Sequence, residues 1–272
     1  MQMMLTIFFS VFCIFLGSFF TVVVYRLPLI LNDQWKKNAL NLLNQGNLVL
    51  TNEKKFNLFL PFSHCPHCKK YLTILQKIPL LSYFILGRKC SHCQIKISFR
   101  YPLIELLTLV VSLSVIGRFG LSLQTISALI LTWGLLILAF IDFEHQLLPD
   151  IIIFPLMWCG LLLSIKKVFV SPESAILGAS GAYLFLYLLA KGYQWIIKTE
   201  PMGEGDFKCF ALLGSWFGIK TIPYILFIAA ATGSLVGIVY YLYDRESLKE
   251  GIPFGPFLAL SGWVTLLSQL YL

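Results

Sequence analysis

The chain has 272 residues, of which 58% are hydrophobic and only 12% charged, and its mean hydropathy is +0.80. Soluble domains carry about 25% charged residues, so this composition excludes a soluble globular protein, a disordered chain and a secreted disulfide scaffold. The net charge of +8 is concentrated in one part of the chain. Together these features predict an all-α polytopic membrane protein.

The first apolar run covers residues 4–25 and stops at Arg26-Leu27-Pro28. It lacks the basic start and the small-residue cleavage site of a signal peptide, so we expect a retained membrane helix. About 20 apolar residues are needed to cross the hydrocarbon core. Seven further runs lie at 102–116, 121–141, 151–165, 175–197, 207–217, 222–243 and 253–272. The sequence therefore predicts about eight transmembrane helices.

Basic residues gather between the first and second apolar runs. From Arg26 to Arg100 there are 12 basic and 2 acidic residues, whereas the rest of the chain has 9 basic and 11 acidic residues. The positive-inside rule assigns this loop to the cytoplasm and the N-terminus to the outside. The connections at 142–150, 198–206 and 244–252 then share the cytoplasmic side. Because the basic residues are scattered, we expect no nucleic-acid partner.

Four of the seven cysteines form two C-x-x-C pairs in the basic loop, with 21 residues between the pairs. The pairs are Cys65 with Cys68 and Cys90 with Cys93. Two such pairs are typical of a structural Zn²⁺ site with four thiolate ligands. Two disulfides or redox-active thiols are the alternatives, and a reducing cytoplasm disfavours the disulfides. The adjoining His64, His67 and His92 are interpreted as flanking residues, because four thiolates complete the zinc shell.

Two clusters of acidic residues lie in predicted cytoplasmic connections. Residues 141–150 read IDFEHQLLPD and residues 202–208 read MGEGDFK. A carboxylate from each cluster can meet at the membrane surface, where two close carboxylates share a proton and can activate water against a peptide carbonyl. The plainer interpretation is that Asp150 and Asp206 only stabilise helix starts, and for Asp150 we favour it. Glu105, inside an apolar run, either pairs with a loop cation or lines a cavity.

The segment 203–206 resembles the GxGD signature of membrane aspartyl proteases. Together with Asp142 and the Leu148-Pro149-Asp150 run, it is similar to the type IV prepilin peptidase family. Further segments that resemble motifs of this family lie at 17–28, 99–102 and 252–257. The resemblance therefore covers nearly the whole chain.

The resemblance implies a bifunctional enzyme of the bacterial inner membrane whose active site faces the cytoplasm. Such an enzyme cleaves the leader peptide of type IV prepilins or type II secretion pseudopilins, and it then N-methylates the new N-terminal residue with S-adenosylmethionine. Carried over residue by residue, the resemblance assigns the catalytic aspartates to Asp142 and Asp206. No GxGxxG fingerprint marks a site for the methyl donor, so its binding residues are not assigned.

These expectations divide the chain into three parts. Residues 1–27 form a transmembrane helix, residues 28–101 a cytoplasmic zinc loop, and residues 102–272 a transmembrane aspartyl peptidase core. The expected partners are the pilin substrates and the lipid bilayer. A proton-coupled transporter is an alternative, but it has no need of a four-cysteine loop. A non-catalytic assembly factor that docks through that loop is the other alternative.

Overall fold

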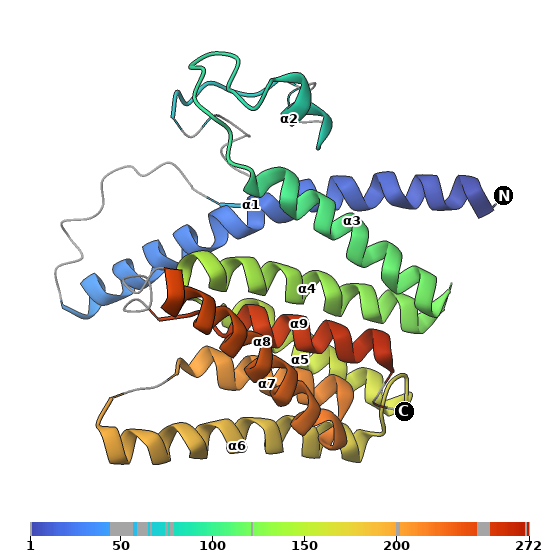
Figure 1. The fold of residues 1–272 in the computed structure, drawn as a ribbon, viewed down its shortest axis with the longest axis vertical. Coiled ribbons are helices and arrows are strands. Elements are labelled where there is room, and N and C mark those ends of the chain that lie inside the picture. Colours follow the sequence, from blue (N-terminus) through green and yellow to red (C-terminus); the bar gives the residue numbers. More distant parts are fainter. Residues whose placement is uncertain are drawn as a thin grey trace. The chain divides into compact units, whose positions relative to one another are not determined.

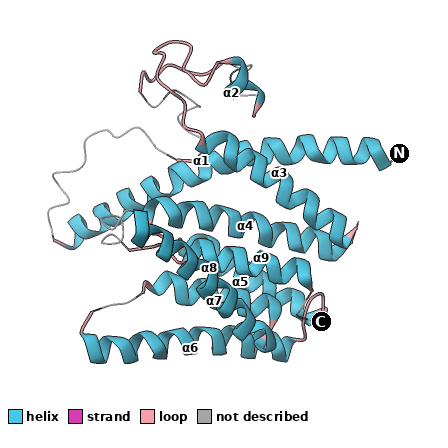
Figure 2. Ribbon diagram, viewed as in Figure 1, coloured by secondary structure: helices cyan, strands magenta, loops and turns pink. Residues whose placement is uncertain are grey.

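The computed structural model describes residues 2–43, 57–58, 65, 67–73, 76, 79–120, 122–199, 202–243, 251–269 and 271. His64 and most of the predicted connection at 244–252 lie outside these residues. The described residues form helices joined by loops, with no strand among them (Figure 2). The chain divides into two compact units, Met1–Leu113 and Ser114–Leu272.

Each of the eight predicted apolar runs forms a helix, which confirms the all-α fold class (Figure 1). The eight helices are α1 (Gln2–Leu42), α3 (Arg100–Phe119), α4 (Leu123–His145), α5 (Asp150–Ile165), α6 (Pro172–Ile197), α7 (Glu204–Phe217), α8 (Ile222–Tyr243) and α9 (Gly255–Ser268). Two short helices are added to them, α2 (Leu81–Ile85) and the 3-10 helix η3 (Ile219–Thr221).

Five helical segments of the described chain are long and apolar enough to cross a membrane. They are Phe8–Leu42, Arg100–Phe119, Leu123–His145, Pro172–Ile197 and Ile219–Tyr243. The protein is therefore a multi-pass membrane protein. The helices α5, α7 and α9 have 16, 14 and 14 residues. At a rise of about 1.5 Å per residue they are shorter than the ~30 Å hydrocarbon core, so their crossing stays a prediction.

The first helix does not end at Pro28 as the sequence predicted, because α1 continues through this proline to Leu42. An internal proline removes one backbone hydrogen bond, but a helix can bend and continue past it. The segment that follows contains several strong helix formers, among them Leu, Gln, Lys and Ala. Arg26 is buried, and its Nη1 donates to the carbonyl oxygens of Asn57 (3.1 Å) and Leu58 (3.3 Å). The start of the predicted loop is therefore helical.

Within the second unit, α7 is the central helix. It packs against α5, α6, α8 and α9, and ten of its residues between Phe207 and Phe217 are buried. A helix that is apolar on all sides is buried on all sides, which explains the central place of so short a segment. The Phe207 ring lies edge-on to Tyr183 and Tyr187 of α6, with ring centroids 6.2 and 6.3 Å away. These rings fix the first turn of α7.

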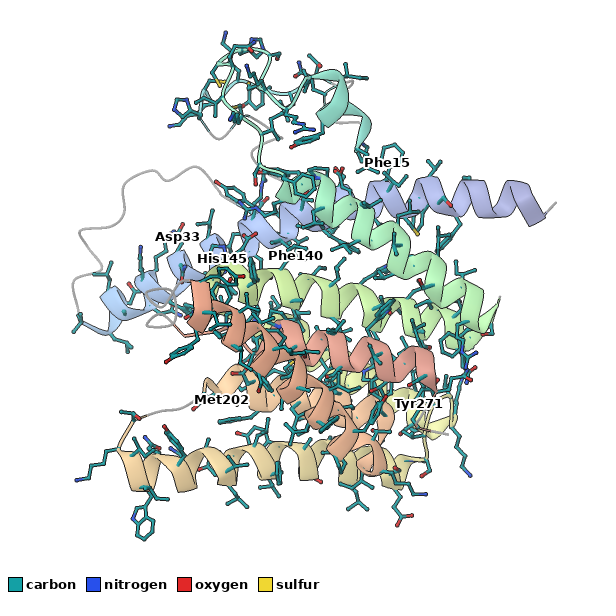
Figure 3. All side chains as sticks on the ribbon, in the orientation of Figure 1. Phe15, Asp33, Phe140, His145, Met202 and Tyr271 are labelled. Atoms are coloured by element: carbon teal, nitrogen blue, oxygen red, sulfur yellow. The ribbon has the colours of Figure 1, made fainter. Side chains whose placement is uncertain are left out.

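The two acidic clusters lie toward the same end of the second unit. Figure 3 shows His145, the last residue of α4, and Met202, just before α7, on one side of this unit, with Tyr271 toward the other side. The start of α9 also reaches this end, because α9 packs along α4 and its first residue contacts Asp142. The end of α4 and the starts of α7 and α9 therefore meet.

Candidate functional site

Asp142 lies in the last turn of α4 and is 5% exposed. Its Oδ2 accepts a hydrogen bond of 2.8 Å from the backbone N–H of Gly255, the first residue of α9. The helix closes just beyond it, where Gln146 takes a left-handed conformation and its N–H donates to the Asp142 carbonyl oxygen (2.8 Å). The Asp142 carboxyl group is thus held by the N-terminus of another helix.

Asp206 lies in the first turn of α7, which begins after Gly203. Its carboxyl group is within electrostatic range of Asp142, so the structure brings the two aspartates together. Its Oδ1 is buried and has no hydrogen-bond partner among the described residues. A carboxylate that only stabilised a helix start would use its oxygens on free N–H groups. A role for Asp206 in stabilising the start of α7 alone therefore leaves this buried oxygen unexplained.

Leu148 fills the space behind the carboxyl pair. It is 8% exposed and packs against two glycines, Gly205 of α7 and Gly255 of α9. A Cβ atom at Gly205 would lie 2.8 Å from Leu148 Cβ, and one at Gly255 would lie 3.0 Å from Leu148 Cδ2. Both contacts are closer than ordinary van der Waals contact. The two glycines therefore let the starts of α7 and α9 approach the segment that follows α4.

Asp150 is not part of the carboxyl pair. It begins α5, and its two carboxylate oxygens accept hydrogen bonds of 3.0 and 2.9 Å from Lys208 Nζ of α7. The Asp150 side chain is 48% exposed, and such partly exposed ion pairs contribute about 0–1 kcal/mol. A structural role at a helix start remains the better interpretation of Asp150, although its oxygens bond to a lysine rather than to backbone N–H groups.

In the first unit, the structure brings together all four cysteines of the two C-x-x-C pairs. Their Sγ atoms lie within 4.8 Å of one another. The two pairs have the same local fold: Lys69 N–H donates to the Cys65 carbonyl oxygen (2.9 Å), and Gln94 N–H donates to that of Cys90 (3.0 Å). Both donors lie in the left-handed region with φ of 57°. Each pair is thus a tight turn that presents two sulfurs on one side.

The spacing of the sulfurs fits a tetrahedral metal site. With Zn–S bonds of about 2.3 Å, two thiolates on a tetrahedron lie about 3.8 Å apart. The Cys65 and Cys93 Sγ atoms are 3.8 Å apart. A disulfide needs about 2.05 Å, and none of the seven cysteines is in a disulfide. The donor set and its spacing therefore suit Zn²⁺ better than two disulfides.

Glu105 of α3 is a buried carboxylate in the first unit, 6% exposed. Its Oε2 accepts a hydrogen bond of 2.7 Å from the N–H of Leu80, and its carboxyl group also interacts with the Ser18 side chain of α1. Leu80 lies just before α2. The sequence predicted that Glu105 pairs with a loop cation or lines a cavity, and neither prediction accounts for these contacts. The carboxylate instead links the segment before α2 to the helices α1 and α3.

Two family descriptions match the chain. Residues 11–119 match "Bacterial Peptidase A24 N-terminal domain", and residues 129–238 match "Type IV leader peptidase family". The chain is 42% identical to the prepilin leader peptidase/N-methyltransferase of Legionella pneumophila over 258 residues, which are 94% of this chain and 89% of the relative. The protein of the same name from Aeromonas hydrophila is 41% identical over 256 residues, 94% of this chain and 88% of the relative.

The chain belongs to the prepilin leader peptidase/N-methyltransferase family. The Pseudomonas aeruginosa member is 40% identical over 251 residues, 92% of this chain and 86% of that relative. No solved structure matches the chain. The resemblance to prepilin peptidases in the sequence is thereby confirmed.

The carboxyl pair and the cysteine cluster fall in different segments of the family match. Asp142 and Asp206 lie in the segment described as leader peptidase, whereas the cysteine cluster lies in the N-terminal segment. Gly255 lies beyond both segments, 113 residues from Asp142 in the chain. Its contact with Asp142 was not predicted, since no local sequence signal reports a contact across that distance. The 252–257 run only marked the region as similar to the family.

Proposed function

We propose that this chain cleaves the leader peptide of type IV prepilins or type II secretion pseudopilins with Asp142 and Asp206 as its catalytic pair. It then N-methylates the new N-terminal residue with S-adenosylmethionine. Family membership supports both activities. The observation that carries the assignment of the peptidase residues is the carboxyl pair at the end of α4 and the start of α7: Asp142 is 5% exposed, and Asp206 Oδ1 is buried within electrostatic range of it.

The chemistry follows from the closeness of the two carboxyl groups. Two neighbouring carboxyl groups in a site largely shielded from water do not both ionise, so they hold one proton between them. The ionised member takes a proton from water, and the protonated member donates to the scissile carbonyl oxygen. The pair therefore supplies the acid and the base of peptide hydrolysis without a covalent intermediate.

In this proposal Cys65, Cys68, Cys90 and Cys93 hold a structural Zn²⁺ in the loop of residues 28–101. A four-thiolate site has no open position for water, so the metal shapes the loop and takes no part in proteolysis. The peptidase core is then residues 102–272, and residues 1–27 are a transmembrane segment. S-adenosylmethionine supplies the methyl group, and no residue is assigned to its binding.

Zinc content tests the metal assignment. Purified protein is expected to contain about one zinc per chain by elemental analysis, because four thiolates close one structural site. Replacing Cys68 with Ser should lower that content, whereas the matched change of Cys159 in α5 to Ser should leave it unchanged. Wild-type protein with no metal and four titratable thiols in the loop would contradict the assignment.

The proposed location is the bacterial inner membrane, with the N-terminus outside and the catalytic pair facing the cytoplasm. The charge distribution supports this orientation, because the segment from Arg26 to Arg100 has 12 basic and 2 acidic residues. The positions of the acidic clusters, toward one end of the second unit, agree with a shared membrane side for both aspartates (Figure 3).

Leader cleavage by the purified, detergent-solubilised protein is the deciding experiment. A prepilin mixed with the protein is expected to lose its leader, and with S-adenosylmethionine the product should also gain the mass of one methyl group. Mass spectrometry of the pilin N-terminus measures both changes. An intact prepilin after prolonged incubation with folded protein would contradict the proposal and favour a non-catalytic assembly factor.

A further inference from the structure

The two carboxyl groups of the pair have unequal surroundings. Asp142 Oδ2 receives the Gly255 N–H at 2.8 Å from the start of α9. Asp206 Oδ1 is buried with no donor among the described residues. The Gly203 backbone interacts with the Asp206 carboxyl group, and a Cβ atom built on Gly203 would lie 3.7 Å from Asp206 Oδ2. One oxygen of Asp206 is therefore the atom of the pair that still needs a proton or a donor.

We infer that the Gly255 N–H is a positioning group that keeps Asp142 ionised as the base of the pair, while Asp206 carries the shared proton on Oδ1 and is the acid. This inference rests on the proposed function and assigns the two roles within it. A hydrogen bond donated to a carboxylate stabilises its charged form, and the N-terminus of a helix favours a negative charge. A buried ionised oxygen without a donor is costly, whereas a protonated one is not.

In the described part of the chain, no other charged group near the pair explains which of the two carboxyl groups holds the proton. No positive side chain of the described residues acts on either carboxyl group. The helices α8 and α9 contain no Asp, Glu, Lys, Arg or His. The other ionisable side chains on α4, α5, α6 and α7 are Glu144 and His145 (3.8 Å apart), Asp150 and Lys208 (2.9 Å apart), Glu173, Lys191 and the exposed Glu204, and Lys198 directly follows α6. The Cys209 thiol is buried and lies within electrostatic range of both aspartates.

The structure leaves no room for a side chain at Gly255. A Cβ there would lie 2.7 Å from Asp142 Oδ2 and 3.0 Å from Asp142 Cγ. Leu148 Cδ2, also 3.0 Å away, closes the same space from the other side. Only glycine therefore allows the backbone N–H to reach the carboxylate, and the constraint is the close approach rather than the backbone conformation.

The role assignment fixes the path of each proton. Water forms a bond to the scissile carbonyl carbon, loses one proton to the Asp142 carboxylate, and the carbonyl oxygen takes the proton of Asp206. The resulting diol collapses as the C–N bond breaks. Asp142 then gives its proton to the leaving nitrogen, and one diol hydroxyl returns a proton to Asp206. Both carboxyl groups end in their starting states, so the cycle needs no further reactant.

Two changes at Gly255 test this inference with purified full-length protein and a prepilin substrate. Gly255→Ala is expected to lower kcat about 100-fold or more with little change in KM, because the added Cβ displaces the N–H from Asp142 and loss of a preorganised donor costs about 10²- to 10³-fold elsewhere. Loss of the donor disfavours the ionised base, so the acid limb of the kcat–pH profile should move up by about one pH unit. Gly192→Ala is the matched control, since a Cβ at Gly192 meets open space.

A second variant separates loss of the donor from steric damage. Replacing the Gly255 peptide N–H with an ester oxygen adds no side chain, and it should move the acid limb in the same direction. An ester variant with the wild-type kcat and pH profile would overturn the inference. Infrared difference spectra at neutral pH give an independent readout, because Asp206→Asn should remove a protonated carboxyl band. Loss of a carboxylate band alone would place the proton on Asp142 and also overturn the inference.

These outcomes differ from failure of the proposed function. If the Asp142→Asn and Asp206→Asn variants both cleave prepilin like the wild type, the catalytic pair itself is wrong. If both lose cleavage but the ester variant is unchanged, only the role of Gly255 is wrong.

Discussion

Asp206→Asn is expected to abolish leader cleavage, and Asp142→Asn to do the same, while both proteins accumulate in the membrane like the wild type. An amide of the same size can neither accept the proton of water nor donate one to the carbonyl oxygen. Loss of one general acid or base costs about 10²- to 10⁴-fold in rate. Folding should survive because asparagine has nearly the size and shape of aspartate, and the charge that Asp142→Asn removes near the N-terminus of α9 is worth only about 0.3–1 kcal/mol.

Asp150→Asn is the matched control for these variants. It removes the same charge from a neighbouring helix start, but Asp150 lies in a half-exposed ion pair with Lys208 and outside the carboxyl pair. We expect a much milder loss of cleavage, measured as the initial rate of leader removal from purified prepilin. Full cleavage by the Asp206→Asn protein would remove Asp206 from the mechanism.

The wild-type rate should also depend on pH in a bell shape. Hydrolysis needs one ionised and one protonated carboxyl group, so the rate falls at low pH, where both are protonated, and at high pH, where both are ionised. An Asp150→Asn protein should keep this shape.

The Asp142→Asn protein is expected to methylate a pre-cleaved pilin as well as the wild type does. Methyl transfer requires an unprotonated terminal amine and a bound sulfonium donor, and neither requirement involves a pair of aspartates. The amine exists only after cleavage, so the same variant should fail to methylate full-length prepilin. Incorporation of labelled methyl groups from S-adenosylmethionine into the two substrates measures the difference.

Cys68→Ser is the contrasting variant for this second experiment. We expect it to reduce both activities, because loss of one of four thiolates unfolds the zinc loop and disturbs substrate docking. If the Asp142→Asn protein binds pre-cleaved pilin but transfers no methyl group, the two activities share one centre.

Local patterns in the sequence determined the helices and the cysteine cluster. The eight apolar runs form helices, because backbone groups in an apolar environment must bond within their own segment. The two C-x-x-C pairs predicted sulfurs that the structure gathers within 4.8 Å, since each pair is a tight turn with its own backbone bonds. The end of α1 was predicted less well, because Pro28 weakens a helix without always stopping it.

The neighbours of the two aspartates depended on the tertiary structure. The acidic clusters 141–150 and 202–208 indicated that carboxylates from two helices can meet, and the order of membrane spans gave them a common side. The hydrogen bond from Gly255 to Asp142 and the packing of Leu148 on Gly205 and Gly255 join segments far apart in the chain. Such contacts depend on how α4, α7 and α9 pack, and packing geometry has no local sequence period to report it.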